Sequence, residues 1–291
     1  MPEHDTAHRE HGWTEPPMRG WGPPLPGELD RIVIVSPHLD DAVLGCANFM
    51  AAHPGVVVVT VFAGNPAQYP TDPMRKWDVQ SGFAPGDDVM EVRRHEDTTA
   101  LGGLDASAVH LEFIEHTYNP ADRPVAPDVV VDALAPALAA LDPTVVLAPF
   151  GLANPDHDVT HRACMLARDR LDRDVSHTPD ETSKQISTRD AAPPKRPMSW
   201  WLYQDMGYSN IPGMLAWRIS SLFRRNLWPT PVCPTTTTDE ARKQAAIACY
   251  PTQLLALEDD WAISRKLAAP APEQFWRIAP PPPGWERLTA E

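Results

Sequence analysis

Positive charge is scarce in this chain. Its 291 residues include 25 Lys and Arg against 39 Asp and Glu, a formal net charge of -14 at pH 7. This charge argues against a nucleic-acid backbone or an anionic membrane as the main partner, whereas clustered carboxylates would favour a cation. With 43% hydrophobic and 22% charged residues, the composition is that of a soluble globular protein with an ample core.

Long hydrophobic runs and paired cysteines are also missing. No apolar run approaches the roughly 18 to 20 residues that span a bilayer, and the N-terminal residues hold no apolar stretch of the signal-peptide type. We therefore predict no transmembrane segment and a cytoplasmic location. The four cysteines have no C-x-x-C spacing, so neither a disulfide scaffold nor a cysteine zinc site is predicted.

Proline, by contrast, is abundant, with 34 residues that are unevenly distributed. Three polar or Pro-rich stretches lack apolar periodicity, namely residues 1–30, 172–197 and 269–291. They predict in turn an N-terminal arm, an inserted loop and a C-terminal tail. The remaining residues, 31–268, are predicted to form a single α/β domain.

Within that domain, short apolar runs alternate with helical patterns. Strands are predicted at 32–35, 56–62, 109–114, 145–148 and 200–203, and helices at 42–52, 89–101, 129–141, 159–171, 240–248 and 253–267, with a loop over 64–88. This alternation predicts an α/β fold with a Rossmann-like, mostly parallel sheet and helices on both faces. Ligands bind such sheets at the carboxyl ends of the strands, which makes the residues after 35, 62 and 148 the candidate site.

Two of these strand ends carry histidine and aspartate: His38, Asp40 and Asp41 after the first, and Asn154-Pro155-Asp156-His157 after the fourth. A catalytic zinc takes three ligands from His and carboxylate and keeps one position open. His38, one of the two aspartates and His157 would supply that set. The other aspartate would then face the metal-bound water as a general base. Taken alone, the first cluster is equally explained by an N-cap at Asp40 or Asp41.

The segment VSPHLDDAVLGC, residues 35–46, resembles the first signature of the PIG-L/LmbE-like family of zinc-dependent N-deacetylases. The family pattern is His-Pro-Asp-Asp-Glu, and this chain has Leu39 and Ala42 in place of the Pro and Glu. Further segments are similar to family motifs in the same order: Val92–Gly102, Asn154–His157, Trp201–Tyr208 and Lys243–Gln253. The resemblance covers about residues 30–268 and implies the Rossmann-like fold of that family.

Carried over to these positions, the resemblance implies His38, Asp41 and His157 as ligands of Zn²⁺, although His/Asp sites also accept other divalent metals. It implies Asp40 as the general base that activates the zinc-bound water. It places Arg93 near the site as a residue that binds substrate. An equally weighted alternative for Arg93 is a surface ion pair with Glu96 on the same helix face.

One departure from the family concerns Asn154, which stands where the second signature has a His. An Asn amide can donate a hydrogen bond to a developing oxyanion but cannot deliver a proton at neutral pH. Three alternatives follow. Asp40 acts as both base and acid, or His161 one turn further along contributes, or the enzyme is weak or has lost hydrolysis altogether.

The function expected from this resemblance is hydrolysis of an N-acetyl or other N-acyl group on an amino sugar or sugar-bearing metabolite. A mycothiol-type thiol-conjugate amidase and a catalytically silent metal-binding relative are the alternatives. Substrate choice is assigned to residues 64–88 and to 203–228, where Trp217, Phe223 and Trp228 lie. The oligomeric state stays open, with a homo-oligomer as one option.

Overall fold

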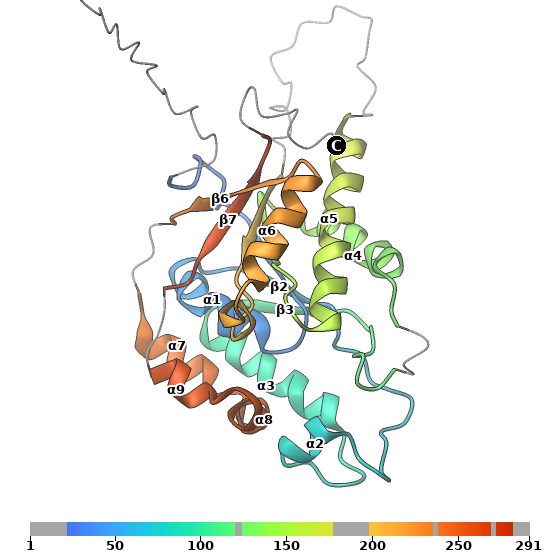
Figure 1. Ribbon diagram of the computed structural model, residues 1–291. Coiled ribbons are helices and arrows are strands. Elements are labelled where there is room, and N and C mark those ends of the chain that lie inside the picture. Colours follow the sequence, from blue (N-terminus) through green and yellow to red (C-terminus); the bar gives the residue numbers. More distant parts are fainter. Residues whose placement is uncertain (1–21, 120–123, 177–197, 235–237, 269–271, 282–291) are drawn as a thin grey trace, which may run out of the picture.

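A seven-stranded sheet forms the centre of the computed structural model (Figure 1), which describes residues 22–119, 124–176, 198–234, 238–268 and 272–281. Its strand order is β3-β2-β1-β4-β5-β7-β6. The strands are β1 (Ile32–Ser36), β2 (Val57–Thr60), β3 (Ser107–His110), β4 (Val145–Pro149), β5 (Ser199–Tyr203), β6 (Trp228–Val232) and β7 (Phe275–Ala279). Strands β1 to β5 pair in parallel, and β7 is antiparallel to both β5 and β6. The predicted α/β fold with a mostly parallel sheet is confirmed.

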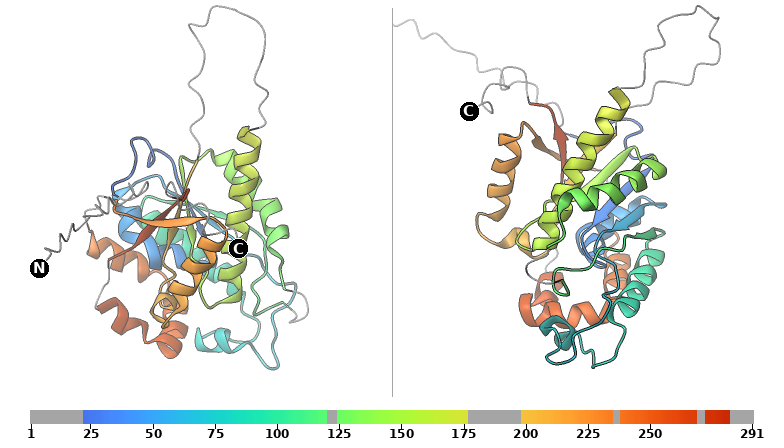
Figure 2. Two further views of the ribbon diagram at one scale, coloured as in Figure 1. Left: turned by 45° about the horizontal axis from the view of Figure 1, so that its top comes forward. Right: turned by 90° about the vertical axis from the view of Figure 1, so that its right-hand side faces the viewer.

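Helices cover both faces of this sheet (Figure 2). One face packs against α1 (Asp41–Ala52), α3 (Val89–Gly103) and α7 (Glu240–Ile247), and the other against α4 (Pro127–Leu141), α5 (Pro155–Ser176) and α6 (Met214–Arg224). The remaining helices are α2 (Lys76–Gln80), the short η1 (Tyr208–Asn210), α8 (Pro251–Trp261) and α9 (Ile263–Ala268). None of the described helices is both long and apolar enough to cross a membrane.

The apolar runs form central strands because both of their faces are covered. In β1, Ile32 and Ile34 join the core under α1, α3 and α7, whereas Val33 and Val35 join the core under α4 and α5. All five residues of β1 are buried. A strand between two helical layers needs apolar residues at successive positions rather than at alternate ones, which is the pattern that identified it.

Several elements differ from the prediction. The expected loop 64–88 contains α2, and the strand expected at 109–114 ends at His110 as β3. The helix expected over 253–267 is two helices, because Ala262 adopts a left-handed φ of 48° between α8 and α9. No strand was predicted for β6, whose sequence WPTPV holds two prolines; it lies at the edge of the sheet, where a missing backbone N–H is tolerated.

The ordered fold also extends beyond residues 31–268. Strand β7 falls within the predicted tail, yet it pairs with β5 and β6 inside the sheet. In the predicted arm, Glu28 is buried and accepts hydrogen bonds from Trp201 Nε1 and Arg277 Nε, at 2.9 and 2.8 Å. Of the predicted loop 172–197, helix α5 includes residues up to Ser176, and 177–197 lie outside the described residues.

Candidate metal centre and active site

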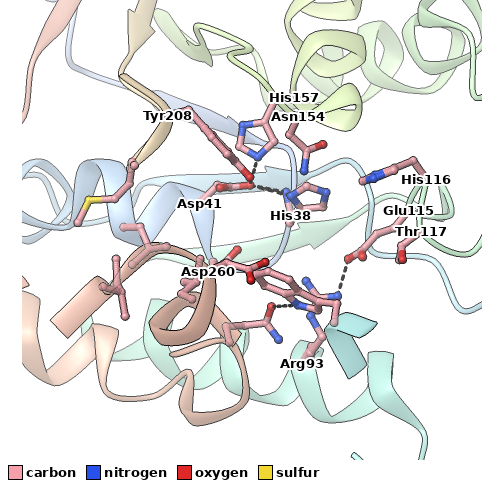
Figure 3. Close-up of a pocket in the computed structure, with 18 residues that line it drawn as sticks. His38, Asp41, Arg93, Glu115, His116, Thr117, Asn154, His157, Tyr208 and Asp260 are labelled. Carbon is pink, nitrogen blue, oxygen red and sulfur yellow. Dashed lines mark hydrogen bonds and ion pairs between the residues drawn. The ribbon is translucent and has the colours of Figure 1, made fainter. Parts of the chain in front are cut away.

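The carboxyl ends of β1, β4 and β5 open onto a cavity of about 290 Å³ (Figure 3). Strands β2 and β3 follow β1 on one side of the sheet, and β5, β7 and β6 follow β4 on the other side. The gap between β1 and β4 is therefore the point where the strand order reverses, which is where ligands bind in open α/β sheets. The sequence analysis expected the site at this edge.

Three of the predicted residues meet in this cavity. Asp41 Oδ2 lies 3.1 Å from His38 Nδ1 and 3.1 Å from His157 Nε2. One donor atom from each of these side chains can be chosen so that all lie within 4.8 Å of one another. His38 follows β1, Asp41 begins α1, and His157 lies in the first turn of α5. The fold thus brings together groups that are more than a hundred residues apart.

In each imidazole, the ring nitrogen that points away from Asp41 contacts a second carboxylate. His38 Nε2 lies 3.1 Å from Asp156 Oδ2, and His157 Nδ1 lies 2.5 Å from Asp205 Oδ1. Histidines that bind metals ordinarily donate their second ring N–H to such a partner, which fixes the ring and its tautomer. The other ring nitrogens both face Asp41. The arrangement of one ring nitrogen toward Asp41 and the other toward a carboxylate is the arrangement found for histidines that bind a metal.

The charges around the trio favour a positive charge at its centre. Burial alone lowers the pKa of His157, but the charge of Asp41 and the contact with Asp205 outweigh it and raise that pKa to about 9. Burial likewise opposes the charge of His38, whose pKa is nevertheless raised by Asp156 and Asp41. Two imidazoles and one carboxylate are ligands suited to Zn²⁺ or a related divalent ion. The residues present therefore fit the metal.

Asp40 faces the cavity instead of capping α1. It occupies the position before the helix, yet its side chain makes no capping hydrogen bond. Ser36 Oγ accepts from the Ala42 N–H at 3.1 Å and so does the capping. Burial, together with the charge of Asp41, raises the pKa of Asp40 to about 7, although Arg93 opposes the shift. The N-cap alternative for Asp40 is thus not what the structure shows.

Asn154 both caps α5 and lines the cavity. Its Oδ1 accepts a hydrogen bond of 2.8 Å from the Asp156 N–H, as an N-cap side chain does. The side chain also hydrogen-bonds the hydroxyl of Tyr208, whose ring meets the His157 ring edge-on with 5.1 Å between centroids. Because Oδ1 is committed to the helix, the NH₂ group is the part of Asn154 left to bond the tyrosine.

His161 is not placed to take over the missing proton transfer. It is buried beneath the site, and its Nδ1 lies 2.9 Å from the carbonyl oxygen of Pro149. Burial and the nearby Arg218 lower its pKa to about 3. An imidazole in this setting stays neutral and structural, which answers one of the alternatives left by Asn154.

Arg93 lines the cavity, but its ion-pair partner is not the expected one. Its Nη1 lies 2.5 Å from Glu115 Oε1, and both side chains are buried. Glu96 instead accepts hydrogen bonds from Thr252, at 3.0 Å from the backbone N–H and 2.7 Å from the hydroxyl. The surface pair of Arg93 with Glu96 is therefore wrong, and each residue anchors a different part of the site.

Some lining residues fall in segments that the sequence analysis had marked without naming the residue: Trp77 in 64–88, Met206, Gly207 and Tyr208 in 203–228, and Gln253 in the Lys243–Gln253 motif. Other lining residues were not identified from the sequence: Glu115, His116, Thr117, Leu257, Asp260 and Ile263. Asp205 and Tyr208 lay within the quoted Trp201–Tyr208 motif, which was the available signal for them. The aromatic residues proposed for substrate choice lie elsewhere. Trp217 is 55% exposed on α6, and Phe223 packs on Trp228, with 4.7 Å between ring centroids.

Comparison with known protein families gives a match to part of this chain. Residues 33–168 match the family model PIG-L, described as GlcNAc-PI de-N-acetylase. The resemblance to the PIG-L/LmbE-like family is confirmed. The matched segment includes the trio and Asp40 as well as Arg93 and Asn154. A search of curated proteins by sequence gives no significant match.

Solved structures of deacetylases share the fold. A deacetylase triple mutant from the teicoplanin biosynthetic pathway is 22% identical, with a TM-score of 0.63 over 87% of this chain and 100% of that one. The A40926 pseudoaglycone deacetylase is 24% identical, with a TM-score of 0.59 over 85% and 96%. The N,N'-diacetylchitobiose deacetylase from Pyrococcus horikoshii is 15% identical, with a TM-score of 0.51 over 86% and 84%. At these identities the likeness establishes the fold.

Proposed function

We propose that the protein is a zinc-dependent hydrolase that removes an N-acetyl or other N-acyl group from an amino sugar or a sugar-bearing small molecule. One observation carries the proposal: the trio of His38, Asp41 and His157, whose side chains are 12%, 12% and 2% exposed, lines the same cavity as a carboxylate, Asp40, that caps no helix. Metal ligands beside a carboxylate that is free to act as a base are the groups that metal-dependent hydrolysis of an amide uses. The match to PIG-L supports the same reaction class.

His38, Asp41 and His157 would hold the metal, which when bound would polarise the acyl carbonyl and make a water molecule acidic near neutral pH. Asp156 and Asp205 keep the two imidazoles oriented with one nitrogen toward Asp41. Asp40 accepts the proton of the attacking water, because it is the cavity carboxylate next in sequence to the trio and is free of capping duty. The two imidazoles are thus fixed by named contacts, whereas Asp40 is left free to exchange a proton.

Two further steps follow from the cavity's polar groups. The NH₂ of Asn154, next to Tyr208, donates to the oxygen on which negative charge develops. Asp40 then returns its proton to the departing nitrogen, since Asn154 holds no transferable proton and His161 is turned to Pro149. The carboxyl of Asp40 thus serves as base and then as acid.

The substrate class is supported by the relatives and not by this chain alone. The family description names a GlcNAc-bearing molecule, and the solved relatives are deacetylases whose printed names refer to teicoplanin, an A40926 pseudoaglycone and diacetylchitobiose. All are consistent with a substrate in which the acylated nitrogen is carried by a sugar. We extend that class to this protein as a proposal.

The test is acetate release from a panel of N-acetylated glycosides, with zinc supplied. We expect turnover by the wild type and a loss of about 10²- to 10⁴-fold in kcat for Asp40→Asn. Asp132→Asn, which removes an equally charged but exposed side chain on α4, serves as the matched control. A rate in Asp40→Asn close to that of the wild type would exclude the assigned base.

A catalytically silent relative is the second candidate, and the capping role of Asn154 is the observation that favours it. In that case the wild type binds its ligand without turnover, and Asn154→His restores hydrolysis. If the proposal is correct, the wild type is active and Asn154→His brings no gain, because the new side chain forfeits the bond to the Asp156 N–H. Cleavage of a larger amide without acetate release would instead indicate a thiol-conjugate amidase.

A further inference from the structure

The cavity has a second end that the proposed chemistry does not use. Opposite the trio it is lined by Trp77 of α2, by Gln253, Leu257 and Asp260 of α8, and by Ile263 of α9. Figure 3 shows Asp260 on the α8 side of the cavity, away from His157. A substrate whose acyl group reaches the trio and whose remainder points toward α8 would contact these side chains. They are therefore placed to choose the substrate.

The indole of Trp77 is held in a fixed orientation. Its Nε1 donates to Gln253 Oε1 at 3.2 Å, and Gln253 Nε2 donates to Thr252 Oγ1 at 3.1 Å. Thr252 in turn donates to Glu96 of α3. Gln253 is buried, with 1% of its surface exposed. This chain of bonds ties the edge of the indole to the protein interior and leaves a half-buried aromatic surface at the cavity wall.

Asp260 is held in the same way by polar contacts from α2. Its Oδ1 accepts from Lys76 Nζ at 3.0 Å and from Gln80 Nε2 at 3.1 Å. These two bonds lower the pKa of Asp260, so it is ionised at neutral pH. A carboxylate offers about four lone-pair sites on two oxygens. Asp260 therefore retains acceptor capacity for hydroxyl donors of a ligand.

The charge of the cavity restricts the ligand further. Among the described residues that line it, the carboxylates are Asp40, Asp41, Glu115 and Asp260, and the single Lys or Arg is Arg93. Arg93 is already paired with Glu115. At the Asp260 end of the cavity, away from the trio that would hold the metal, a phosphate or carboxylate on the ligand would meet the like charge of Asp260. Neutral hydroxyl groups, which donate to carboxylates, fit this lining.

We propose that Trp77 and Asp260 form the subsite for the ring of a neutral, hydroxyl-rich substrate, with the apolar face of a pyranose on the indole and ring hydroxyls donating to Asp260. The proposal rests on the proposed function for the position of the acyl group. It adds a specific prediction about substrates, namely that uncharged glycosides are preferred over phosphorylated ones.

The test compares Trp77→Ala with the wild type on methyl N-acetyl-glucosaminide, on its 6-phosphate and on N-acetylethanolamine, which lacks a ring. We expect Trp77→Ala to raise KM for the neutral glycoside about tenfold, the scale of one aromatic contact, and to leave kcat within about twofold. KM for N-acetylethanolamine should stay unchanged. Trp217→Ala, an exposed tryptophan outside the cavity, is the matched control and should behave as the wild type.

The phosphorylated glycoside tests the charge of the subsite. We expect the wild type to turn it over with at least tenfold lower kcat/KM than the neutral glycoside. In Asp260→Asn, the ratio of kcat/KM between the two glycosides should be smaller. Asp259→Asn, the exposed neighbour on α8, controls for the loss of one negative charge. An unchanged KM in Trp77→Ala, or a preference for the phosphorylated glycoside, would overturn the subsite.

Failure of the subsite is kept distinct from failure of the proposed function by a binding measurement. Saturation-transfer NMR with methyl glucoside, which is uncharged and has no acyl group, should give signals with the wild type and much weaker signals with Trp77→Ala. Trp77→Phe, which keeps an aromatic ring, should retain the NMR signals. Retained signals would show that α2 tolerates a substitution at this position. If every N-acetyl compound is inert, the hydrolase proposal fails, and the NMR result alone decides the subsite.

Discussion

Asp205 provides the sharpest test of how the metal centre is built, because it contacts the trio through a single atom pair. Its Oδ1 lies 2.5 Å from His157 Nδ1, and the two side chains are 0% and 2% exposed. Removing the carboxylate in Asp205→Ala leaves a buried ring nitrogen that water cannot reach. Such outer partners are worth about 10- to 100-fold in metal affinity, or about 1.4 to 2.7 kcal/mol.

We expect the loss of zinc affinity in Asp205→Ala to lie near the upper end of that range, since alanine offers no group that could bond His157 Nδ1. Asp205→Asn, which keeps an acceptor oxygen but loses the charge, should lie near the lower end. The assay is competition for zinc against a chromophoric chelator, with Asp132→Asn on the surface of α4 as control. Unchanged zinc affinity in a folded Asp205→Ala protein would refute the argument that this carboxylate supports the ligand.

Two further predictions concern stability. Glu96→Ala removes two hydrogen bonds to Thr252 and should lower the free energy of unfolding by about 2 kcal/mol or more. Urea titration measures this loss, and Glu91→Ala, at an exposed position of the same helix, should change the free energy of unfolding little. Because the pKa of His161 is lowered to about 3 from about 6.5 when unfolded, the unfolded state takes up the proton first as the pH falls. His161 should therefore cost the protein about 3 kcal/mol of stability between pH 7 and pH 4, a loss that His161→Asn should remove; equal acid sensitivity of the two proteins would contradict the assigned shift.

The sequence predicted the strands whose own residues form a recognisable apolar pattern. Strands β1, β2 and β4 are continuous apolar runs, because helices cover both of their faces, and such runs are visible without knowledge of their neighbours. Strands β6 and β7 carry no such signal. The prolines of β6 and the Pro-rich surroundings of β7 argue against strands, and only pairing across the sheet reveals them.

The same distinction applies to the site. His38, His157 and one of the two aspartates could be predicted to meet because they follow strands at one edge of a parallel sheet, and the family resemblance implied Asp41 as that aspartate. The partners that orient them could not be predicted in this way. Asp205 is 48 residues from His157, and Glu115 is 22 residues from Arg93. Such pairings depend on how loops pack in three dimensions: the motif Trp201–Tyr208 includes Asp205 but does not show that it contacts His157.

The measurement that tests the central claim most directly is metal content by mass spectrometry, on the wild type and on His157→Ala, after purification with zinc supplied. The account predicts about one metal ion per chain in the wild type and a loss of that ion in the variant, with Asp132→Asn unchanged. A wild type that stays metal-free with zinc present, or a His157→Ala protein that keeps its metal, would contradict a centre built from His38, Asp41 and His157.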